Sequence, residues 1–295
     1  MREYSDTATR QHRYRRLTHP RSGASLRPAV SVVIPTLNGA ASLEELLPRL
    51  MNACRGLVDV RDIVVVDDGS DPDQRRRLQA LGVRYPHLVL ARLPRRRGQV
   101  HATIVGVSRA VGEIIVTMDD DGAHPPEVVP RMVGMLQNDP GLGLVYAAAR
   151  ASTAKAVRTG PGRSPRRARR ADMRRVVRSA GTRLNNLHFH LFLGLPWDVP
   201  VGSFRAIRRD LLDRALATPV RYPYLSAMLL QFRPGVASVR YRGRETSDRS
   251  TRGSRHEIRR LVGVLWRLLL YWGPLRPFGR LVRGPQPVRG SVSVE

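Results

Sequence analysis

The chain has very little cysteine, lysine or aromatic side chain. Of its 295 residues, only Cys54 is a cysteine and only Lys155 is a lysine, while aromatic residues make up 5%. A single cysteine excludes an internal disulfide, and the chain has neither a CxxC nor an HExxH pattern that would indicate a zinc site. We therefore expect a protein of a reducing compartment that uses neither disulfides nor thiolate-bound zinc.

Acidic residues are also few compared with basic ones. The chain has 51 Lys+Arg against 24 Asp+Glu, a formal net charge of +27. Such an excess indicates a polyanionic partner: nucleic acid, nucleotide phosphates or an anionic membrane surface. An arginine bias inherited from a GC-rich genome is the alternative. A nucleic-acid-binding protein is the less favoured reading, because a base-stacking platform needs interleaved aromatic residues.

Several segment types are missing as well. No GxxxxGK[ST] and no GxGxxG follows a strand-like run, so neither a P-loop nor a dinucleotide fingerprint is present. The unbroken apolar runs are far shorter than the roughly 18 to 20 residues that span a bilayer. Residues 1–28 are polar and arginine-rich without an apolar core, which predicts a basic mobile tail rather than a signal peptide.

From Val30 onward, strand-like and helix-like patterns alternate. Leucines from Leu43 to Leu50, with Met51 and Cys54, recur at the spacing of an amphipathic helix, with a kink expected at Pro48. The strands are expected at 30–35, 62–66, 87–93, 114–116 and 143–149, and the helices at 43–54, 73–81, 100–111 and 126–136. Gly112 is expected to end the third helix. This alternation predicts an α/β fold with a largely parallel sheet, whose ligands gather at the carboxyl ends of the strands.

Two acidic turns come directly after two of these strands. Asp67 and Asp68 follow the second strand, and Asp119, Asp120 and Asp121 follow the fourth. Three adjacent carboxylates are unfavourable without a neutralising cation, so the triplet indicates a divalent metal with oxygen ligands. A solvated acidic loop is the alternative. Because both turns follow strand ends, we expect them to line one crevice.

Four motifs agree in order and spacing with a known family. They are VSVVIPTLN at 30–38, VVVDDGS at 64–70, RRGQVHATIVGVSRAVGE at 96–113 and MDDDGAHPPE at 118–127. Over about residues 30–271 the chain resembles the family-two inverting glycosyltransferases. It is most similar to the branch, exemplified by dolichyl-phosphate mannose synthase, that transfers a sugar from a nucleotide sugar to polyprenyl or dolichyl phosphate. The resemblance implies a nucleotide-binding sheet of glycosyltransferase-A type with helices on both faces, followed by C-terminal amphipathic helices.

The resemblance also implies roles for the residues of the first two motifs. Pro35 and Asn38 match the loop that cradles the nucleotide. Asp67 and Asp68 match the acidic pair that contacts the base and ribose. The turn at Gln99 corresponds to one that the family places near the sugar donor, although an ordinary turn is the alternative there.

The acidic triplet matches the family's Asp-x-Asp motif. Asp119 and Asp121 correspond to the nucleotide and metal contacts, with Mg²⁺ or Mn²⁺ as the implied cofactor, and Asp121 is the residue most directly tied to catalysis. Asp120 fills the variable middle position and is included with the nucleotide-sugar contacts. Two departures stand out: Gly39 replaces a usual glutamate, and Ala123 replaces a usual glutamine at the metal. Water or Asp120 could cover the missing glutamine.

For the acceptor phosphate, the resemblance points to arginines of the second half. Arg205 lies in the segment Gly-Ser-Phe-Arg at 202–205, where we expect a strand or turn entering a helix, and Arg244 matches a phosphate-binding arginine. A lysine of the same loop is replaced by one of Arg249, Ser250 or Arg252, and Arg249 is the second candidate phosphate contact. Since a phosphate monoester has a second pKa of about 6, it needs little help from a base. Asp198 is therefore only a candidate base, and a structural turn is its alternative role.

Together these observations predict an inverting, metal-dependent hexosyltransferase of the mannose or glucose type. Its donor would be a UDP- or GDP-hexose and its acceptor polyprenyl phosphate; a soluble or polysaccharide acceptor is the alternative. We expect the catalytic domain at residues 29–220 and an acceptor or membrane-surface segment at 221–295. The arginine run at 158–183 and the apolar segment at 258–282 would contact an anionic membrane surface; a solvated charged face and a core-packing helix are their respective alternatives. The expected location is cytoplasmic, peripheral at the inner face of the cell membrane.

Overall fold

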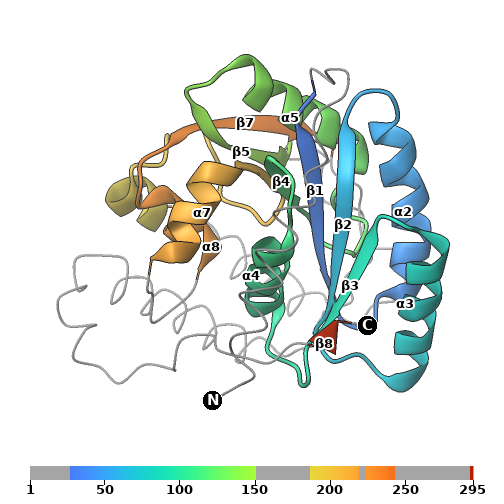
Figure 1. Cartoon of the computed structure of the whole chain (residues 1–295). Coiled ribbons are helices and arrows are strands. Elements are labelled where there is room, and N and C mark those ends of the chain that lie inside the picture. Colours follow the sequence, from blue (N-terminus) through green and yellow to red (C-terminus); the bar gives the residue numbers. More distant parts are fainter. Residues whose placement is uncertain (1–26, 151–186, 219–223, 243–292, 295) are drawn as a thin grey trace, which may run out of the picture.

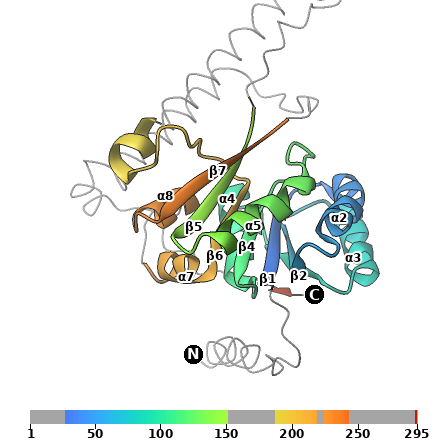
Figure 2. The same ribbon diagram turned by 90° about the horizontal axis from the view of Figure 1, so that it is seen from above.

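One eight-stranded sheet forms the centre of the molecule (Figures 1 and 2). The structure is a computed structural model that describes residues 27–150, 187–218, 224–242 and 293–294. The order of the strands across the sheet is β7-β5-β6-β4-β1-β2-β3-β8. The strands are β1 (Ala29–Thr36), β2 (Asp59–Asp67), β3 (Leu88–Arg92), β4 (Ile114–Thr117), β5 (Leu142–Ala149), β6 (Arg205–Arg208), β7 (Gly235–Tyr241) and β8 (Ser293–Val294).

Helices alternate with the first five strands, as the sequence pattern predicts. The helices are α2 (Ala40–Cys54), α3 (Pro72–Arg84), α4 (Gln99–Arg109), η1 (Pro126–Val128), α5 (Val129–Asn138), α7 (Arg209–Ala217) and α8 (Leu225–Leu230), and residues 187–193 are also helical. α2 contains Pro48 and buries the predicted leucine stripe together with Cys54, whereas Met51 is only partly buried. The expected elements of residues 30–149 are therefore confirmed, with small differences in their ends.

The direction of the strands changes across the sheet. β1 pairs in parallel with β2 and β4, and β2 pairs in parallel with β3. β6, in contrast, is antiparallel to both β4 and β5, while β5 and β7 are parallel. The expectation of a largely parallel sheet thus holds for β1 to β4 and fails at β6. The apolar pattern of a strand does not reveal its direction, so the sequence did not predict that β6 runs antiparallel.

Both faces of the sheet are covered by helices, which explains why the central strands β1 and β4 are mostly apolar and buried along their length. Val33 of β1 belongs to a core cluster that also contains apolar residues of α4, α7 and α8. Its neighbours Val32 and Ile34 belong to a second cluster, with residues of α2, α3 and α5. Alternate side chains of one strand therefore pack into two apolar cores, one on each face of the sheet. The expected helices on both faces are present.

Pro35 is accommodated inside the central strand β1 because the pairing on one side has already ended. β4 pairs with β1 only as far as Val33, whereas β2 pairs with it as far as Thr36. The Val33 carbonyl accepts a hydrogen bond from the N–H of Met118, which follows β4. The Thr36 carbonyl accepts one from the N–H of Asp68, which follows β2. By alternation, Pro35 turns its nitrogen toward the β4 side, where no ladder bond is required.

Gly112 does not end α4, contrary to expectation, because the C-cap of that helix is Ala110. Gly112 is instead pressed against the start of β1, where its N–H donates to Ser31 Oγ at 2.7 Å. A Cβ on Gly112 would lie 2.5 Å from the Ser31 nitrogen and 2.8 Å from the Ala29 carbonyl oxygen. Glycine is needed here for close approach of two chain segments.

The sheet extends past the domain boundary expected after residue 220. α8 and β7 both follow that position, and β7 pairs with β5 along its length. The first part of the expected segment 221–295 therefore belongs to the same sheet as the catalytic motifs. Within the described residues, no helix is long and apolar enough to cross a bilayer. The arginine run at 158–183, the apolar segment at 258–282 and nearly all of the tail at 1–28 lie outside the described residues.

Candidate active site

The three loops that carry the predicted donor-side residues lie at one edge of the sheet, because the parallel neighbours β1, β2 and β4 all end there. The first loop follows β1, the Asp67 turn follows β2, and the acidic triplet follows β4. The antiparallel β6 starts at this same edge, since Arg205 pairs with Thr117 at the end of β4. Residues just before β6 are thus added to the site by a strand that runs the opposite way.

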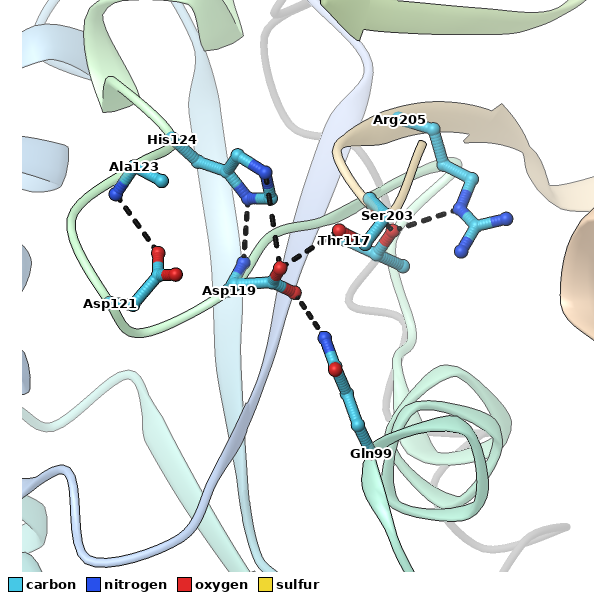
Figure 3. Close-up of polar contacts among 8 residues, drawn as sticks. All are labelled: Gln99, Thr117, Asp119, Asp121, Ala123, His124, Ser203 and Arg205. Carbon is cyan, nitrogen blue, oxygen red and sulfur yellow. Dashed lines mark hydrogen bonds and ion pairs between the residues drawn. The ribbon is translucent and has the colours of Figure 1, made fainter. Parts of the chain in front are cut away.

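Asp119 is held by residues from three parts of the chain (Figure 3). Gln99 Nε2, at the start of α4, donates to Asp119 Oδ1 at 2.6 Å. Ser203 Oγ, just before β6, donates to Asp119 Oδ2 at 2.9 Å. Gln99 thus contacts the acidic triplet, while its expected place near the sugar donor stays a prediction. With both oxygens oriented, the carboxylate is fixed before any ligand arrives.

His124 contacts Asp119 and closes the acidic turn (Figure 3). Its Nδ1 accepts the backbone N–H of Asp119 at 2.9 Å, so that nitrogen carries no proton. Its Nε2 lies 3.9 Å from Asp119 Oδ2, and its ring stacks on Phe204 with centroids 4.9 Å apart. Burial lowers the pKa of His124, although the charges of Asp119 and Asp121 oppose this shift.

Asp120 turns away from its two acidic neighbours toward the first loop. Its Oδ2 accepts the Thr36 hydroxyl at 2.5 Å. Burial raises the pKa of Asp120, and the charges of Asp119 and Asp121 raise it further, against the effect of the Thr36 hydrogen bond. Asp120 thus joins the acidic turn to the end of β1.

Asp121 is the exposed member of the triplet. Its Oδ1 accepts the backbone N–H of Ala123 at 2.9 Å, which closes a tight turn through Gly122 at a φ of 75°. Among the described residues no cationic side chain forms an ion pair with Asp121. Its carboxylate is therefore presented to solvent, as a ligand to an added cation would need to be.

Asp67 and Asp68 are both buried, so they are less open than the expected base and ribose contacts would suggest. Asp68 accepts the backbone N–H groups of Arg97 and Gly98 at 2.6 and 2.8 Å, which anchors the start of α4. Asp67 Oδ1 accepts the N–H of Ser70 at 2.7 Å. Asp67 Oδ2 is buried and has no hydrogen-bond partner in the part of the chain that the structure describes.

Asn38 shapes the first loop and ties it to the second. It has a left-handed φ of 57°, which asparagine tolerates better than most residues. Its side chain exchanges two hydrogen bonds with Asp71, and its backbone N–H donates to Ser70 Oγ at 2.9 Å. The loops after β1 and β2 therefore form one unit beside the acidic turn.

Comparison with known proteins decides the family. The model of "Glycosyl transferase family 2" matches residues 31–216. The chain belongs to this family. It is 42% identical over 109 residues, 37% of this chain, to a dolichol-phosphate mannosyltransferase of Pyrococcus furiosus. It is also 30% identical over 241 residues, 81% of this chain, to an undecaprenyl-phosphate 4-deoxy-4-formamido-L-arabinose transferase of Pseudomonas fluorescens. The matches cover 30% and 64% of those two proteins, less than two thirds of either.

Solved structures agree on the fold of this family-2 chain. A mannosyltransferase of Pyrobaculum calidifontis, solved with GDP-Man and Mn²⁺, aligns over 94% of this chain and 71% of its own, with a TM-score of 0.52 and 22% identity. A glucosyl-3-phosphoglycerate synthase of Mycobacterium tuberculosis, solved with Mn²⁺, UDP and phosphoglyceric acid, aligns over 86% and 84%, with a TM-score of 0.58 and 22% identity. The expected glycosyltransferase-A type of sheet is thereby confirmed.

Arg205 of this family-2 chain is buried beneath the site. Its Nε donates to Thr117 Oγ1 at 3.2 Å and its NH1 to Ser226 Oγ at 2.6 Å. Its guanidinium carbon lies 6.0 Å from the centre of the Tyr146 ring. Within the described residues no carboxylate pairs with it. The strand entering a helix that we expect here is present as β6 and α7, but whether Arg205 reaches an acceptor phosphate stays a prediction.

Of the other acceptor-side candidates, the structure describes only Asp198. Asp198 is exposed, and its backbone carbonyl accepts a hydrogen bond from Arg240 at 3.2 Å. Arg244 and Arg249 lie outside the described residues. Their predicted roles toward the acceptor therefore stay predictions.

Several residues that complete the site had no predicted role. Ser203 and Phe204 lie just before the antiparallel β6, and Thr36 lies at the end of β1. Tyr241, at the end of β7, lies 6.0 Å from Phe204 between ring centroids. Burial raises the pKa of Tyr241, as do the charges of Asp119 and Asp121. The proline pair after His124 was a signal for a fixed turn, but it does not reveal which side chain closes it.

Two carboxylates of the site fit a divalent metal that takes its other ligands from water and a substrate. In the described ranges no three acidic, histidine or cysteine side chains come close enough together to hold a metal ion by themselves. Mg²⁺ commonly uses one or two carboxylates and takes its other oxygens from water and substrate phosphates. The oriented Asp119 and the exposed Asp121 fit that donor set.

Proposed function

We propose that the chain transfers a hexose from UDP- or GDP-hexose to polyprenyl phosphate, with inversion at the sugar carbon. The observation that carries this proposal is the oriented Asp119 beside the exposed Asp121, at the edge where three strands of a family-2 fold end. The names of the relatives support a polyprenyl phosphate acceptor, and the mannosyltransferase solved with GDP-Man and Mn²⁺ supports a nucleotide-sugar donor.

On the donor side, Asp119 and Asp121 would hold Mg²⁺ or Mn²⁺ against the diphosphate. The bound metal would offset the negative charge that develops on the leaving nucleotide diphosphate. Gln99 and Ser203 orient Asp119, so they would act through it. Asp67 offers the nucleotide a buried oxygen that lacks a protein partner among the described residues.

On the acceptor side, the lipid phosphate itself would attack the sugar. With a second pKa of about 6 it is mostly dianionic at neutral pH, so the reaction makes little demand on a general base. Arginines would position it, because a planar guanidinium can bind phosphate through two parallel hydrogen bonds. Arg205, Arg244 and Arg249 are the proposed contacts.

An exposed apolar segment, residues 187–197, supports contact with a membrane surface. Four of the eight large apolar side chains that are exposed in the described residues lie in it: Leu187, Leu191, Phe192 and Trp197. The helix at 187–193, yellow in Figures 1 and 2, lies on the opposite side of the molecule from α2 and α3. In the sequence the arginine run at 158–183 comes just before it. Arginine next to exposed apolar side chains suits the surface of an anionic bilayer, so we place the protein peripherally at the cytoplasmic face.

The test is incubation of the purified chain with radiolabelled UDP- and GDP-hexoses, polyprenyl phosphate and Mn²⁺ or Mg²⁺. We expect a lipid-linked product with at least one donor, and its loss on removal of the metal by chelation. A panel of soluble acceptors, including phosphoglyceric acid, runs in parallel. Product with a soluble acceptor alone would contradict the lipid acceptor, and no product with any pair would contradict the transferase proposal.

Asp121→Ala provides the matched test of the site. It should lower the rate by at least about 100-fold, because it removes a metal ligand at the leaving group. The control is Asp59→Ala, since Asp59 is also exposed but lies at the opposite end of β2 from Asp67. Full activity of Asp121→Ala, or equal losses in both variants, would refute the assigned role.

A further inference from the structure

We propose that Asp120 is a positioning residue whose carboxylate occupies the space of a side chain at position 39, and that it thereby locks the acidic turn to the first nucleotide loop. The role of this contact in nucleotide binding rests on the proposed function. The packing of Asp120 against Gly39 does not depend on it. The three acids of the triplet then have different roles: Asp119 and Asp121 would bind the metal, and Asp120 positions the acidic turn.

The space at residue 39 is already filled. A Cβ built on Gly39 would lie 1.9 Å from Asp120 Oδ2, 2.9 Å from Asp120 Cγ and 2.6 Å from Thr36 Oγ1. Real Cβ atoms essentially never approach other heavy atoms closer than 3.0 Å. No side chain larger than hydrogen therefore fits at position 39 while Asp120 keeps this rotamer.

The backbone at Gly39 does not itself require glycine. Gly39 has φ −106° and ψ 19°, a conformation that other residues adopt, and it is the N-cap of α2. Glycine at a helix N-cap is common, but Ser, Thr, Asn or Asp would serve at least as well. The steric demand of Asp120 is thus the reason for glycine here.

The contact made by Asp120 reaches all three loops at this edge of the sheet. The Thr36 hydroxyl donates to Asp120 Oδ2 at 2.5 Å, and Thr36 is almost fully buried. The Thr36 carbonyl in turn accepts the N–H of Asp68 at 2.9 Å. A chain of hydrogen bonds therefore runs from the turn after β4, through the end of β1, to the turn after β2.

The geometry also decides between the two missing side chains of the family pattern. Asp120 Oδ2 faces Thr36 and the α-carbon of Gly39, which stands where a glutamate is usual. It therefore supplies a carboxylate at position 39 rather than replacing the glutamine expected at position 123. The carboxylate beside the Gly39 α-carbon therefore belongs to Asp120, in the turn after β4, and not to a side chain at the start of α2.

A double-mutant cycle tests the shared space. Gly39→Ala should lower the melting temperature and weaken binding of the donor nucleotide with Mn²⁺, measured by calorimetry, on the order of tenfold. Asp120→Gly should relieve the clash, so that Gly39→Ala combined with Asp120→Gly is more stable than Gly39→Ala alone. Additive changes in melting temperature would overturn the proposal. The melting temperatures are measured without nucleotide, so they distinguish failure of this inference from failure of the proposed function.

Two further variants separate positioning from metal binding. Asp120→Asn keeps an oxygen that can accept from Thr36, so it should bind Mn²⁺ and nucleotide within about threefold of the unmodified chain. Asp120→Ala should raise the KM for the donor far more than it lowers kcat. Gly39→Glu combined with Asp120→Gly, which returns the acid to position 39, should recover nucleotide binding relative to Gly39→Glu alone. Loss of Mn²⁺ binding in Asp120→Asn, comparable with Asp121→Ala, would make Asp120 a metal ligand and refute the positioning role.

Discussion

At the scale of single residues, His188 is buried at a cost that nothing in the described part of the chain offsets. Neither ring nitrogen has a hydrogen-bond partner there, and the ring lies among Phe189 and Phe192. A buried polar group left unpaired costs about 1 to 3 kcal/mol, whereas an apolar group of similar shape avoids that cost. We predict that His188→Phe raises the free energy of unfolding in denaturant titrations. The control is His190→Phe, which removes the hydrogen bond from Nδ1 to the Leu195 carbonyl and should destabilise the fold.

The same residue predicts a dependence of stability on pH. Burial lowers the pKa of His188, so the unfolded state takes up a proton more readily than the folded state. The contribution of His188 to the free energy of unfolding is therefore constant above the pKa of the unfolded state, about 6.5. As the pH falls below that value, this contribution to stability is lost. His188→Phe should flatten the fall in melting temperature between about pH 6.5 and 5. An unchanged slope would mean that His188 does not titrate in this window.

Residue types and spacing predict that carboxylates follow two neighbouring strands, but they do not predict which side chains contact them. Asp119 and Asp121 follow directly from an acidic run at the end of a strand. The roles of Ser203 and Thr36 depend on which strand lies beside which, and that order is a property of the folded sheet. The left-handed Asn38 is likewise understood only once Asp71 is seen opposite it.

At the scale of helices and strands, two glycines inside helices have opposite surroundings. A Cβ on Gly106 of α4 would lie 2.3 Å from Val33 Cγ1 and 3.0 Å from Val66 Cγ2, so the helix rests directly on the sheet. A Cβ on Gly134 of α5 would meet nothing within 4 Å. Gly106→Ala should destabilise by about 1 to 3 kcal/mol through overpacking, while Gly134→Ala should stabilise by about 0.5 to 1 kcal/mol through helix propensity. Chemical denaturation of the two variants checks the sign of each effect.

The order of helices and strands was predictable to the extent that apolar periodicity determines it. Residues 29–149 show the expected alternation because each strand is buried on both faces and each helix on one. β6 was harder to predict, since it has only four residues and its antiparallel direction arises from pairing with β4 and β5. β7 lies beyond the expected domain boundary for a similar reason: its place beside β5 is a long-range contact.

At the scale of the whole molecule, the excess of positive charge and the exposed apolar segment at 187–197 should act together. Each basic residue close to an anionic bilayer contributes about 1 kcal/mol, and that attraction weakens as salt is added. Inserted apolar side chains contribute in proportion to the area they bury, and salt affects them little. Binding to vesicles that contain phosphatidylserine should therefore fall with rising salt but keep a residual part, and vesicles of neutral lipid should bind much less.

Two leucines of similar exposure separate the apolar contribution from the charge. Leu191 lies in the apolar segment with 57% of its surface exposed, and Leu57 lies after α2 with 61% exposed. Leu191→Ser should reduce co-sedimentation with anionic vesicles several-fold at fixed salt, because it removes an apolar side chain from the bilayer interface. Leu57→Ser, which changes neither the net charge nor the segment, should bind as the unmodified chain does. Equal binding by both variants would mean that arginines alone hold the protein at the surface. A shift in the oligomeric state of Leu191→Ser without a change in vesicle binding would assign the segment to a second copy of the chain instead.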